Sequence, residues 1–466
     1  MRRFLTLASG LLLCACATTR APYVPPQTPV ADRAFTVDAG VAPRPDAPAH
    51  DWWRTLGDDA LEAMVGRAFE NNPGLRGALA RVRAARAART LQATASRPTG
   101  ALSANIDYGQ PALGGGPIQV DVDPQMVIGL GGSALWELDL FGRLDALERA
   151  AEADLSARIW DRRDAQALLA AEVARAWLDL RTAESALALT EENLRIQSGL
   201  VDLTQIRFEE GFATQLDQAL ATSQLRTTRA LQPPLRADRE AALNRLATLT
   251  ALPVADVAET VGAGWLPNAL PDTLPLGDVS GLLRRRADVR AAERTIAAAF
   301  ARADAVHSDF FPRVSLVGDT ALVGTSLDRL TGPNAFGFGV GPSLSWEGLD
   351  RPRVQARLDA AEAETDLAVA LYEEAVLLAL EETQSQFVRF ARQNERLAEL
   401  ARAAQDTRTA VTLSRIRYEE GEDDLLVVLD AESRLLQVDQ ARLDARRASL
   451  AAAINVYQAL GAGWQE

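Results

Sequence analysis

The sequence of 466 residues predicts an internally duplicated, mainly α-helical protein with four β-strands of membrane-spanning length. One half of the chain repeats in the other, because Trp136 recurs as Trp346 and the segment 206–211 recurs as 416–421 at the same offset. Each copy contains two runs of alternating apolar and small polar residues, which is typical of tilted strands in a membrane. Each copy then continues for about 70 residues with helical spacing, which corresponds to a helix of roughly 100 Å.

The N-terminus has the features of a bacterial export signal followed by a lipid-attachment site. Two arginines precede the apolar run 4–13, which is too short to cross a bilayer as a helix. Leucine and alanine stand at the −3 and −1 positions before Cys16, which is the pattern of a lipobox. We therefore expect residues 1–15 to be a signal peptide and Cys16 to carry lipid; the alternative is ordinary cleavage with an unmodified thiol. Cys14 would leave with the signal, so the mature body has no disulfide.

The remaining chain divides into two repeats and their flanking segments. Residues 16–50 are rich in proline, alanine and aspartate, and we expect a lipid-anchored extended segment there; a disordered tether is the alternative. Repeat 1 is predicted over 51–252 and repeat 2 over 284–460. The proline-rich stretch 253–283 separates them, and 461–466 forms a C-terminal tail.

In repeat 1, a helix is predicted over residues 63–95, and Pro98 stops it. The alternating pattern then predicts a β-hairpin over 101–136, whose turn is the glycine- and proline-rich stretch 111–117. The long helix that follows is predicted to end at a turn near Gly211, because glycine readily adopts the left-handed conformation found at helix C-termini. The returning helix contains two consecutive prolines, which should kink or interrupt it.

Repeat 2 has the same order, with a hairpin predicted over 313–346 and a turn near Gly421. Its second strand alternates sharply, with Phe336 and Phe338 on one face and glycines on the other. An apolar face, a face of small polar residues and a terminal tryptophan favour strands that lie in a membrane. The alternative is a soluble hairpin that covers a core.

Composition argues against several classes of function. The formal net charge of −14 argues against nucleic acid as a partner. The two histidines, His50 and His307, are far apart and lack neighbours at metal-ligand spacing, and His307 is expected to pack at a helix end. No phosphate-binding glycine loop or nucleophile motif occurs in the sequence. We expect no enzyme activity, no metal site and no cofactor.

Several short motifs together resemble those of a known family. They are Asp51-Trp52-Trp53, Asn71-Asn72-Pro73, Asp139-Leu140-Phe141-Gly142-Arg143, and Arg417-Tyr418-Glu419-Glu420-Gly421 with Leu429-Asp430-Ala431 downstream. With these motifs and the repeated order of elements, the chain over residues 50–460 resembles the TolC-like outer-membrane efflux proteins, also called the outer membrane factor family. Within that family it is most similar to the NodT-type lipoproteins.

The resemblance implies a homotrimer in the bacterial outer membrane, anchored by lipid and extending far into the periplasm. Four strands per chain cannot close a barrel, since about eight are needed and open edges are not tolerated in lipid. The trimer of the family would supply a 12-stranded transmembrane β-barrel that continues as a long α-helical barrel. The stretch 253–283 would form an equatorial belt around the helices; a plain linker is the alternative.

The resemblance also implies a function. The protein would be a passive duct that exports small molecules such as drugs, driven by an inner-membrane pump to which a periplasmic adaptor protein joins it. A duct for type I protein secretion is a second hypothesis, because the family includes both. A third is a periplasmic coiled-coil scaffold lipoprotein without a pore, in which 101–108 and 335–346 would face water or a soluble core.

The resemblance assigns the two helix turns to the periplasmic tip of the duct, where adaptors dock. The expected tip residues are Arg207, Phe208, Gly211, Thr214, Asp217, Arg417, Tyr418 and Gly421. Glu422, Asp423 and Asp424 form an acidic cluster that is expected to act as gate or selectivity filter, with Asp430 as a further candidate. The alternative is an exposed acidic loop without a gating role. Asp217 and Asp430 are expected to cap helices or to pair with the tip arginines.

Opening of the tip would require an iris-like movement of the second helical hairpin. That movement would release contacts among Arg417, Tyr418 and the acidic cluster. The first copy has Phe212 and Ala213 where the second has acidic residues, so an acidic constriction would come from the second copy alone.

Overall fold

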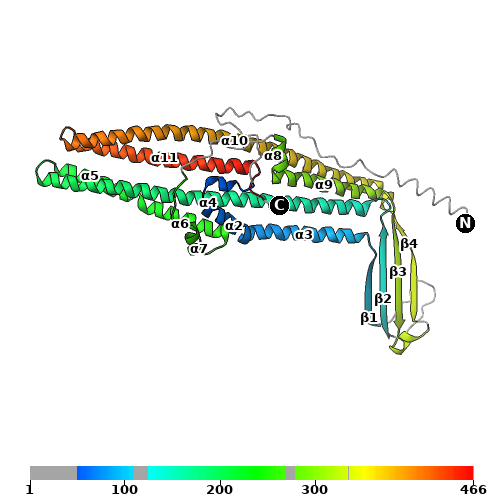
Figure 1. Cartoon of the computed structure of the whole chain (residues 1–466). Coiled ribbons are helices and arrows are strands. Elements are labelled where there is room, and N and C mark those ends of the chain that lie inside the picture. The colour runs from blue at the N-terminus through cyan, green and yellow to red at the C-terminus, as the bar shows by residue number, and fades with distance from the viewer. Residues whose placement is uncertain (1–49, 110–123, 268–278, 334, 465–466) are drawn as a thin grey trace. The chain divides into compact units, whose positions relative to one another are not determined.

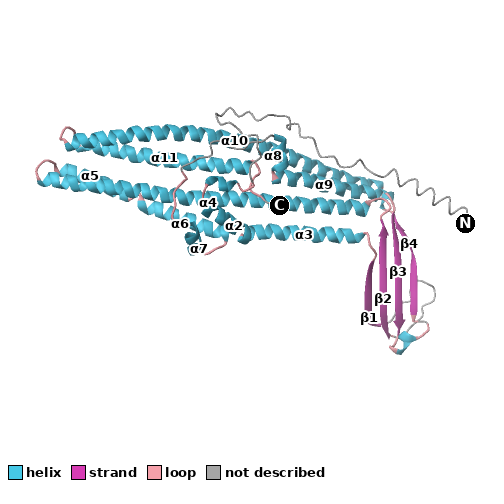
Figure 2. Ribbon diagram, in the orientation of Figure 1, coloured by secondary structure: helices cyan, strands magenta, loops and turns pink. Residues whose placement is uncertain are grey.

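A computed structural model describes residues 50–109, 124–267, 279–333 and 335–464. Long helices and one antiparallel sheet make up these residues (Figures 1 and 2). The expected signal peptide, Cys16 and nearly all of the segment 16–50 lie outside the described residues, as does the whole of the turn predicted at 111–117. No described helix is both long and apolar enough to span a lipid bilayer.

Helix, strand pair, long helix and returning helix occur twice, as the duplicated sequence predicts. The elements of the first repeat and of the segment after it are η2 (Trp52–Leu56), α2 (Asp59–Asn71), α3 (Pro73–Ala95), β1 (Thr99–Gly109), β2 (Gln125–Leu138), α4 (Arg143–Glu209), α5 (Gln215–Arg229), α6 (Gln232–Thr250) and α7 (Val254–Val261). Those that follow are α8 (Val279–Arg285), α9 (Ala287–His307), η3 (Ser308–Phe310), β3 (Arg313–Gly324), η4 (Asp328–Thr331), β4 (Phe336–Ser345), η5 (Glu347–Leu349), α10 (Arg351–Glu419) and α11 (Leu425–Ala459).

Prolines divide two of the helical stretches. The helix predicted over 63–95 is two helices, because Asn72 adopts an extended ψ of 123° before Pro73, as residues before proline tend to do. The Asn72 side chain accepts a hydrogen bond from a backbone N–H in the first turn of α3 at 3.2 Å, which caps that helix. The first returning helix is interrupted between α5 and α6, immediately before Pro233 and Pro234, as expected.

The chain divides into two compact units, which are described separately. The sheet unit comprises the described parts of 81–158 and 292–372, and the helical unit comprises those of 28–80, 159–291 and 373–466.

The sheet unit is built around an antiparallel sheet whose strands follow chain order, with β1 and β4 at its edges. The pairing register places Leu102, Gly132, Thr320 and Phe338 in one row across the four strands. Leu102 is 93% exposed and Phe338 is 76% exposed. One face of the sheet is thus apolar and is not covered by any described part of the chain.

The middle rows of the opposite face carry small and polar side chains. Its rows include Ala101, Ser133, Asp319 and Gly339, followed by Ser103, Gly131, Ala321 and Gly337. A Cβ atom added at Gly339 would lie 2.9 Å from a carboxylate oxygen of Asp319, and one at Gly131 would lie 2.9 Å from the Ser103 hydroxyl. The glycines therefore leave room for polar side chains of the neighbouring strands to lie flat on this face.

Both copies fix the end of their second strand in the same way. The Trp136 indole N–H donates to the Ser96 carbonyl at 2.9 Å, and the Trp346 indole N–H donates to the Phe310 carbonyl at 3.0 Å. Each bond ties the end of a strand pair to the segment that precedes the pair. The repeated tryptophan thus has the same hydrogen bond in both copies, which is structural evidence for the duplication.

The helical unit has an apolar core that joins the first described residues to the last helix. Trp52 and Trp177 are fully buried there, and the Trp52 ring stacks on Tyr457 at 5.1 Å between centroids. The expected tail 461–466 contributes to the same unit, because Trp464 is only 9% exposed and its ring lies 5.6 Å from that of Trp160. The described part of the tail is therefore packed.

Matching contacts connect the helices of each repeat within this unit. The Asn72 amide donates to the Leu249 carbonyl at 2.9 Å, and at the equivalent place in the second repeat Arg286 donates to the Ala459 carbonyl at 2.9 Å. Arg181 binds the start of the stretch that separates the two repeats. It is 3% exposed and donates to the carbonyls at the end of α7 at 3.0 Å. Arg181 also pairs with Asp58 at 3.1 Å, so its buried charge is compensated.

Candidate functional site

The two long helices end in turns of the same construction (Figure 1). Two residues beyond the last residues of α4 and α10, Gly211 and Gly421 have φ angles of +83° and +79°. In the first turn, the glycine N–H and the next N–H donate to carbonyls of the last helical turn at 3.1 and 2.7 Å; in the second turn the distances are 3.1 and 2.8 Å. A left-handed glycine therefore reverses the chain at both predicted positions.

The turns differ in how the next helix begins. Thr214 and Asp217 form a capping box before α5: the Thr214 hydroxyl accepts from the Asp217 N–H at 3.2 Å, and the Asp217 carboxylate accepts from the Thr214 N–H at 2.8 Å. Asp424 occupies the corresponding position before α11, but its side chain makes no cap hydrogen bond. The second turn therefore lacks the local stabilisation that the first one has.

Arg207 joins the first helical hairpin, formed by α4 and α5, to the second, formed by α10 and α11. One guanidinium N–H donates to the Tyr418 carbonyl at 2.8 Å, and the guanidinium carbon lies 4.5 Å from the centroid of the Tyr418 ring. Tyr418 is 7% exposed and belongs to a small apolar cluster with Leu200 of α4 and Leu425 of α11. A hydrogen bond combined with a cation–π contact contributes about 1–3 kcal/mol. This contact therefore holds the two hairpins together near their turns.

Arg417, which is the equivalent of Arg207 in the second repeat, contacts its own turn instead. Its Nε lies 2.9 Å from an Asp423 carboxylate oxygen and 3.7 Å from one of Glu422. The side chains of Arg417 and Glu422 are both more than half exposed, so these ion pairs contribute little to stability. Their effect is to hold Asp423 and Glu422 of the acidic cluster close to one guanidinium.

The structure brings together only some of the residues expected at the tip. Asp217 caps a helix, which is one of its two expected roles. Asp430 pairs with Arg434 one turn along α11 at 2.8 Å and not with a tip arginine. The Tyr418 ring contacts Arg207, whereas Arg417 contacts the acidic cluster.

Sequence reasoning did not identify three residues that stabilise this region. Leu425 and Val428 are buried in the apolar cluster, and Arg434 is the partner of Asp430. The spacing of Arg434 from Asp430 is that of an i, i+4 helical pair, and the two apolar residues have helical spacing. Both signals were available in the sequence.

The described residues contain no group of three or more histidine, cysteine, aspartate or glutamate side chains placed to hold a metal ion. His307 ends α9, and its ring lies 5.9 Å from that of Phe310. This packing at a helix end is what the sequence predicts for His307. The His50 ring lies 5.6 Å from that of Trp464.

Comparison with known proteins identifies the family. A model of the outer membrane efflux proteins matches residues 64–252 and 279–462, which covers most of the first repeat and all of the second. The chain is 32% identical over 471 residues to the outer membrane protein OprJ of Pseudomonas aeruginosa, covering 99% of this chain and 95% of that protein. It is 26% identical over 466 residues to nodulation protein T of Rhizobium leguminosarum bv. trifolii, covering 99% and 97%.

A solved structure has the same architecture. The outer-membrane channel OprN superposes with a TM-score of 0.87 at 35% identity, covering 96% of this chain and all of that one. The repeated helices and the four-stranded sheet are thus those of an outer-membrane channel. The chain belongs to the family of outer membrane efflux proteins, and it is a protein of the bacterial outer membrane.

Proposed function

We propose that three copies of this chain form a passive duct through which small molecules leave the periplasm, as the outer-membrane component of a tripartite efflux system. The four-stranded sheet carries this proposal, because it has one exposed apolar face, a second face with small and polar residues in its middle rows, and edges at β1 and β4. Lipid does not tolerate open strand edges, so the sheet must be closed by other copies. Three copies supply twelve strands, above the minimum of about eight.

The names of relatives support export of small molecules. The chain is 29% identical over 428 residues to the toluene efflux pump outer membrane protein TtgF of Pseudomonas putida. It is 28% identical over 488 residues to the pyoverdine export outer membrane protein OpmQ of Pseudomonas aeruginosa. Toluene and pyoverdine differ widely in polarity, which favours a duct whose pump selects the substrate over a duct that binds one compound.

In this proposal the long helices extend into the periplasm, and their turns meet an adaptor protein that connects the duct to an inner-membrane pump. Lipid on Cys16 would add an anchor in the outer membrane. The pump supplies the energy, and this chain catalyses no reaction. The contact between Arg207 and Tyr418 keeps the two hairpins together in the closed state. The acidic cluster of Glu422, Asp423 and Asp424 favours the entry of cations.

Replacement of both Asp423 and Asp424 by alanine is expected to reduce the cation preference of the duct. The change removes two negative charges per chain and frees the positive charge of Arg417, which now pairs with Asp423 at 2.9 Å. We expect the reversal potential in a salt gradient to move towards zero, since charged constrictions control which ions pass. The measurement is single-channel recording in planar bilayers.

The matched control for this experiment is Glu210→Ala, which removes an exposed carboxylate from the first turn. It should leave selectivity unchanged, because the proposed acidic constriction comes from the second repeat. Wild-type selectivity and conductance in the Asp423→Ala, Asp424→Ala double variant would exclude these residues from the gate.

An arginine in place of Leu102 is expected to impair assembly in the outer membrane. Leu102 is 93% exposed on the apolar face of the sheet, whereas Ser103 is on the opposite face. A charge on the lipid side of a membrane strand costs about 2 kcal/mol, and the trimer would carry it three times. Ser103→Arg is the matched control and should assemble. The test is the yield of heat-modifiable trimer in outer-membrane fractions; equal yields would favour a non-membrane sheet.

A further inference from the structure

The helix α3 is strongly basic in a chain whose formal net charge is −14. It contains five arginines and no acidic residue. Arg89 pairs with Glu148 and Glu152 of α4 at 3.2 and 2.9 Å. Arg81 and Arg83, by contrast, are exposed and form no ion pair with any residue that the structure describes. Within the described residues, these two positive charges are therefore uncompensated.

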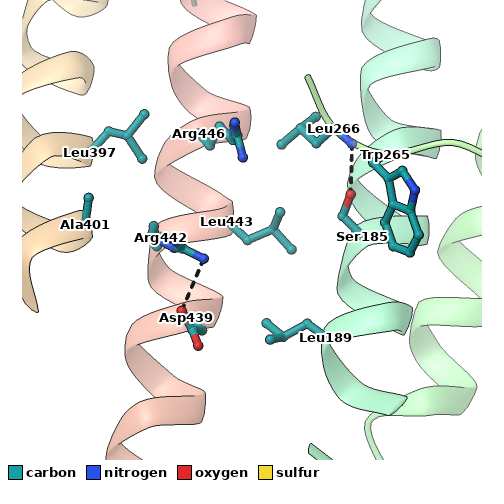
Figure 3. Close-up of a pocket in the computed structure, with 10 residues that line it drawn as sticks. All are labelled: Ser185, Leu189, Trp265, Leu266, Leu397, Ala401, Asp439, Arg442, Leu443 and Arg446. Atoms are coloured by element: carbon teal, nitrogen blue, oxygen red, sulfur yellow. Dashed lines mark hydrogen bonds and ion pairs between the residues drawn. The ribbon is translucent and has the colours of Figure 1, made fainter. Parts of the chain in front are cut away.

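The helix α10 has a segment of opposite charge. Over residues 359–374 it contains six acidic residues and no arginine. Glu364 and Asp366 are exposed, and neither has an ion pair or a side-chain hydrogen bond within the described part of the chain. Asp439 of α11 differs from them, because it pairs with Arg442 on the same helix at 3.3 Å (Figure 3). Glu364 and Asp366 have no such partner among the described residues.

These two helices adjoin the two edges of the sheet. The helix α3 leads into β1 and α10 follows β4, and these strands are the edges (Figure 1). Thr99 at the start of β1 is in the same row as Gly341 near the end of β4, so both helices adjoin the same end of the sheet. Closure of the sheet by other copies pairs β1 of one copy with β4 of the next. The helix α3 of one copy is then next to α10 of another, and the two run antiparallel.

Each of these helices packs one face on its own chain and exposes an apolar face on the opposite side. Val82 of α3 is 5% exposed, whereas Leu91, two and a half turns further on, is 69% exposed. Leu358 of α10 is 7% exposed, whereas Leu367 at the same spacing is 53% exposed. Exposed alanines extend both apolar faces, namely Ala84 and Ala87 on α3 and Ala360 and Ala363 on α10. Two such faces can pack closely, as in a coiled coil.

The uncompensated charges flank these apolar faces at matching positions. Helical spacing places Arg81 on one side of the apolar face of α3 and Arg83 on the other. It places Glu364 and Asp366 on the two sides of the apolar face of α10. At 1.5 Å per residue, the two arginines lie roughly 20 Å from the end of α3 at the sheet, and the two carboxylates lie roughly 20 Å from the start of α10. In an antiparallel pair, the handedness of the helices places Arg83 on the same side as Asp366, and Arg81 on the same side as Glu364.

We propose that α3 of one copy and α10 of the next copy form an antiparallel helix pair at each interface of the trimer. Arg81 binds Glu364 of the next copy on one side of the pair. Arg83 binds Asp366 of the next copy on the other side. This inference rests on the trimer of the proposed function, and it names the helices and charges by which the copies recognise each other. One exposed ion pair contributes little, but both pairs recur at every interface, and like charges there are strongly unfavourable.

The test is the trimer-to-monomer ratio of the full-length protein in detergent, measured by light scattering after incubation at increasing temperatures and low ionic strength. The double variant Arg81→Glu, Arg83→Glu should lower this ratio about tenfold or more, because attraction becomes repulsion at every interface. The matched control Arg81→Lys, Arg83→Lys keeps both charges and should remain close to the wild type. The difference between the glutamate variant and the wild type should shrink in about 1 M salt, where the Debye length is about 3 Å.

A charge-swapped chain separates loss of the helix pair from misfolding. It combines Arg81→Glu and Arg83→Glu with Glu364→Arg and Asp366→Arg, which restores opposite charges on both sides, and it should recover most of the lost trimer. A wild-type ratio in the glutamate variant, or a swapped chain no better than that variant, would overturn the pairing. A monomeric wild type would overturn both the pairing and the proposed trimer. A charge-dependent trimer that does not conduct would refute the duct alone.

Discussion

Arg207→Ala is expected to raise the open probability of the duct in planar bilayers by roughly tenfold, since a loss of about 1.4 kcal/mol from the closed state shifts a two-state equilibrium by that factor. Arg207 donates to the Tyr418 carbonyl at 2.8 Å and covers the Tyr418 ring at 4.5 Å. These are contacts between the two hairpins, so their loss favours separation of the hairpins. The prediction depends on the proposed duct function.

Two variants make this experiment specific. Arg417→Ala removes the equivalent arginine of the second repeat, whose ion pairs with Asp423 and Glu422 lie within its own turn, and it should change the open probability much less. Tyr418→Phe keeps both the carbonyl and an aromatic ring and should behave as the wild type does. An intact Arg207→Ala trimer with wild-type open probability would show that this contact does not hold the tip closed.

The local sequence predicted most of the fold because the relevant signals are local. Alternation of apolar and small residues identified the four strands, and glycine identified both turns, where Gly211 and Gly421 have positive φ. Two consecutive prolines correctly predicted the break between α5 and α6. The break at Pro73 was missed because its helical periodicity continues on both sides, although the residue before a proline rarely stays helical.

The candidate site was predicted less completely because its contacts are not local. Arg207 and Tyr418 are 211 positions apart, and no periodicity links a side chain to a partner at that distance. The offset between the copies made Arg207 and Arg417 look equivalent, yet one crosses to the other hairpin and the other does not. Equal positions in a duplicated chain have different neighbours once the copies pack against each other, and only the structure shows this.

The two copies therefore have the same order of helices and turns, but they differ in the side chains at equivalent positions. The first turn has the capping box of Thr214 and Asp217, whereas the second has acidic residues and no side-chain cap. Loss of a cap costs about 1 kcal/mol, so the second hairpin is the less stable of the two at its turn. A movement that opens the entrance would require less free energy there, which agrees with the proposed iris-like motion of the second hairpin.

The same kind of difference occurs deeper in the helical unit. Asn72 of the first repeat is neutral, but Arg286 at the equivalent place is charged and pairs with Asp288 at 2.7 Å and with Glu382 at 2.8 Å. Asp164 of α4 faces this group. Burial raises the pKa of the Asp164 carboxyl to about 6, and repulsion from Asp288 adds to the effect, while Arg286 partly opposes it.

Asp164→Asn is expected to stabilise the protein at neutral pH. The pKa of Asp164 is about 6 in the folded chain and 3.8 in its ordinary state, so the folded protein binds the proton more tightly than the unfolded chain does. The resulting stabilisation is complete below pH 3.8 and is lost as the pH rises through 6. Above that pH the ionised carboxylate costs about 3 kcal/mol, which a neutral amide of the same shape avoids.

The measurement is the thermal unfolding midpoint of the wild type and the variant at several pH values from 4 to 8. The variant should unfold at a higher temperature than the wild type at pH 7.5, and the difference should shrink towards zero near pH 4, where Asp164 is protonated in the folded wild type. Glu191→Gln, an exposed carboxylate on the same helix, is the control for charge alone and should show no such pH dependence. A difference between Asp164→Asn and the wild type that stays constant from pH 4 to 8 would mean that Asp164 does not titrate in this range.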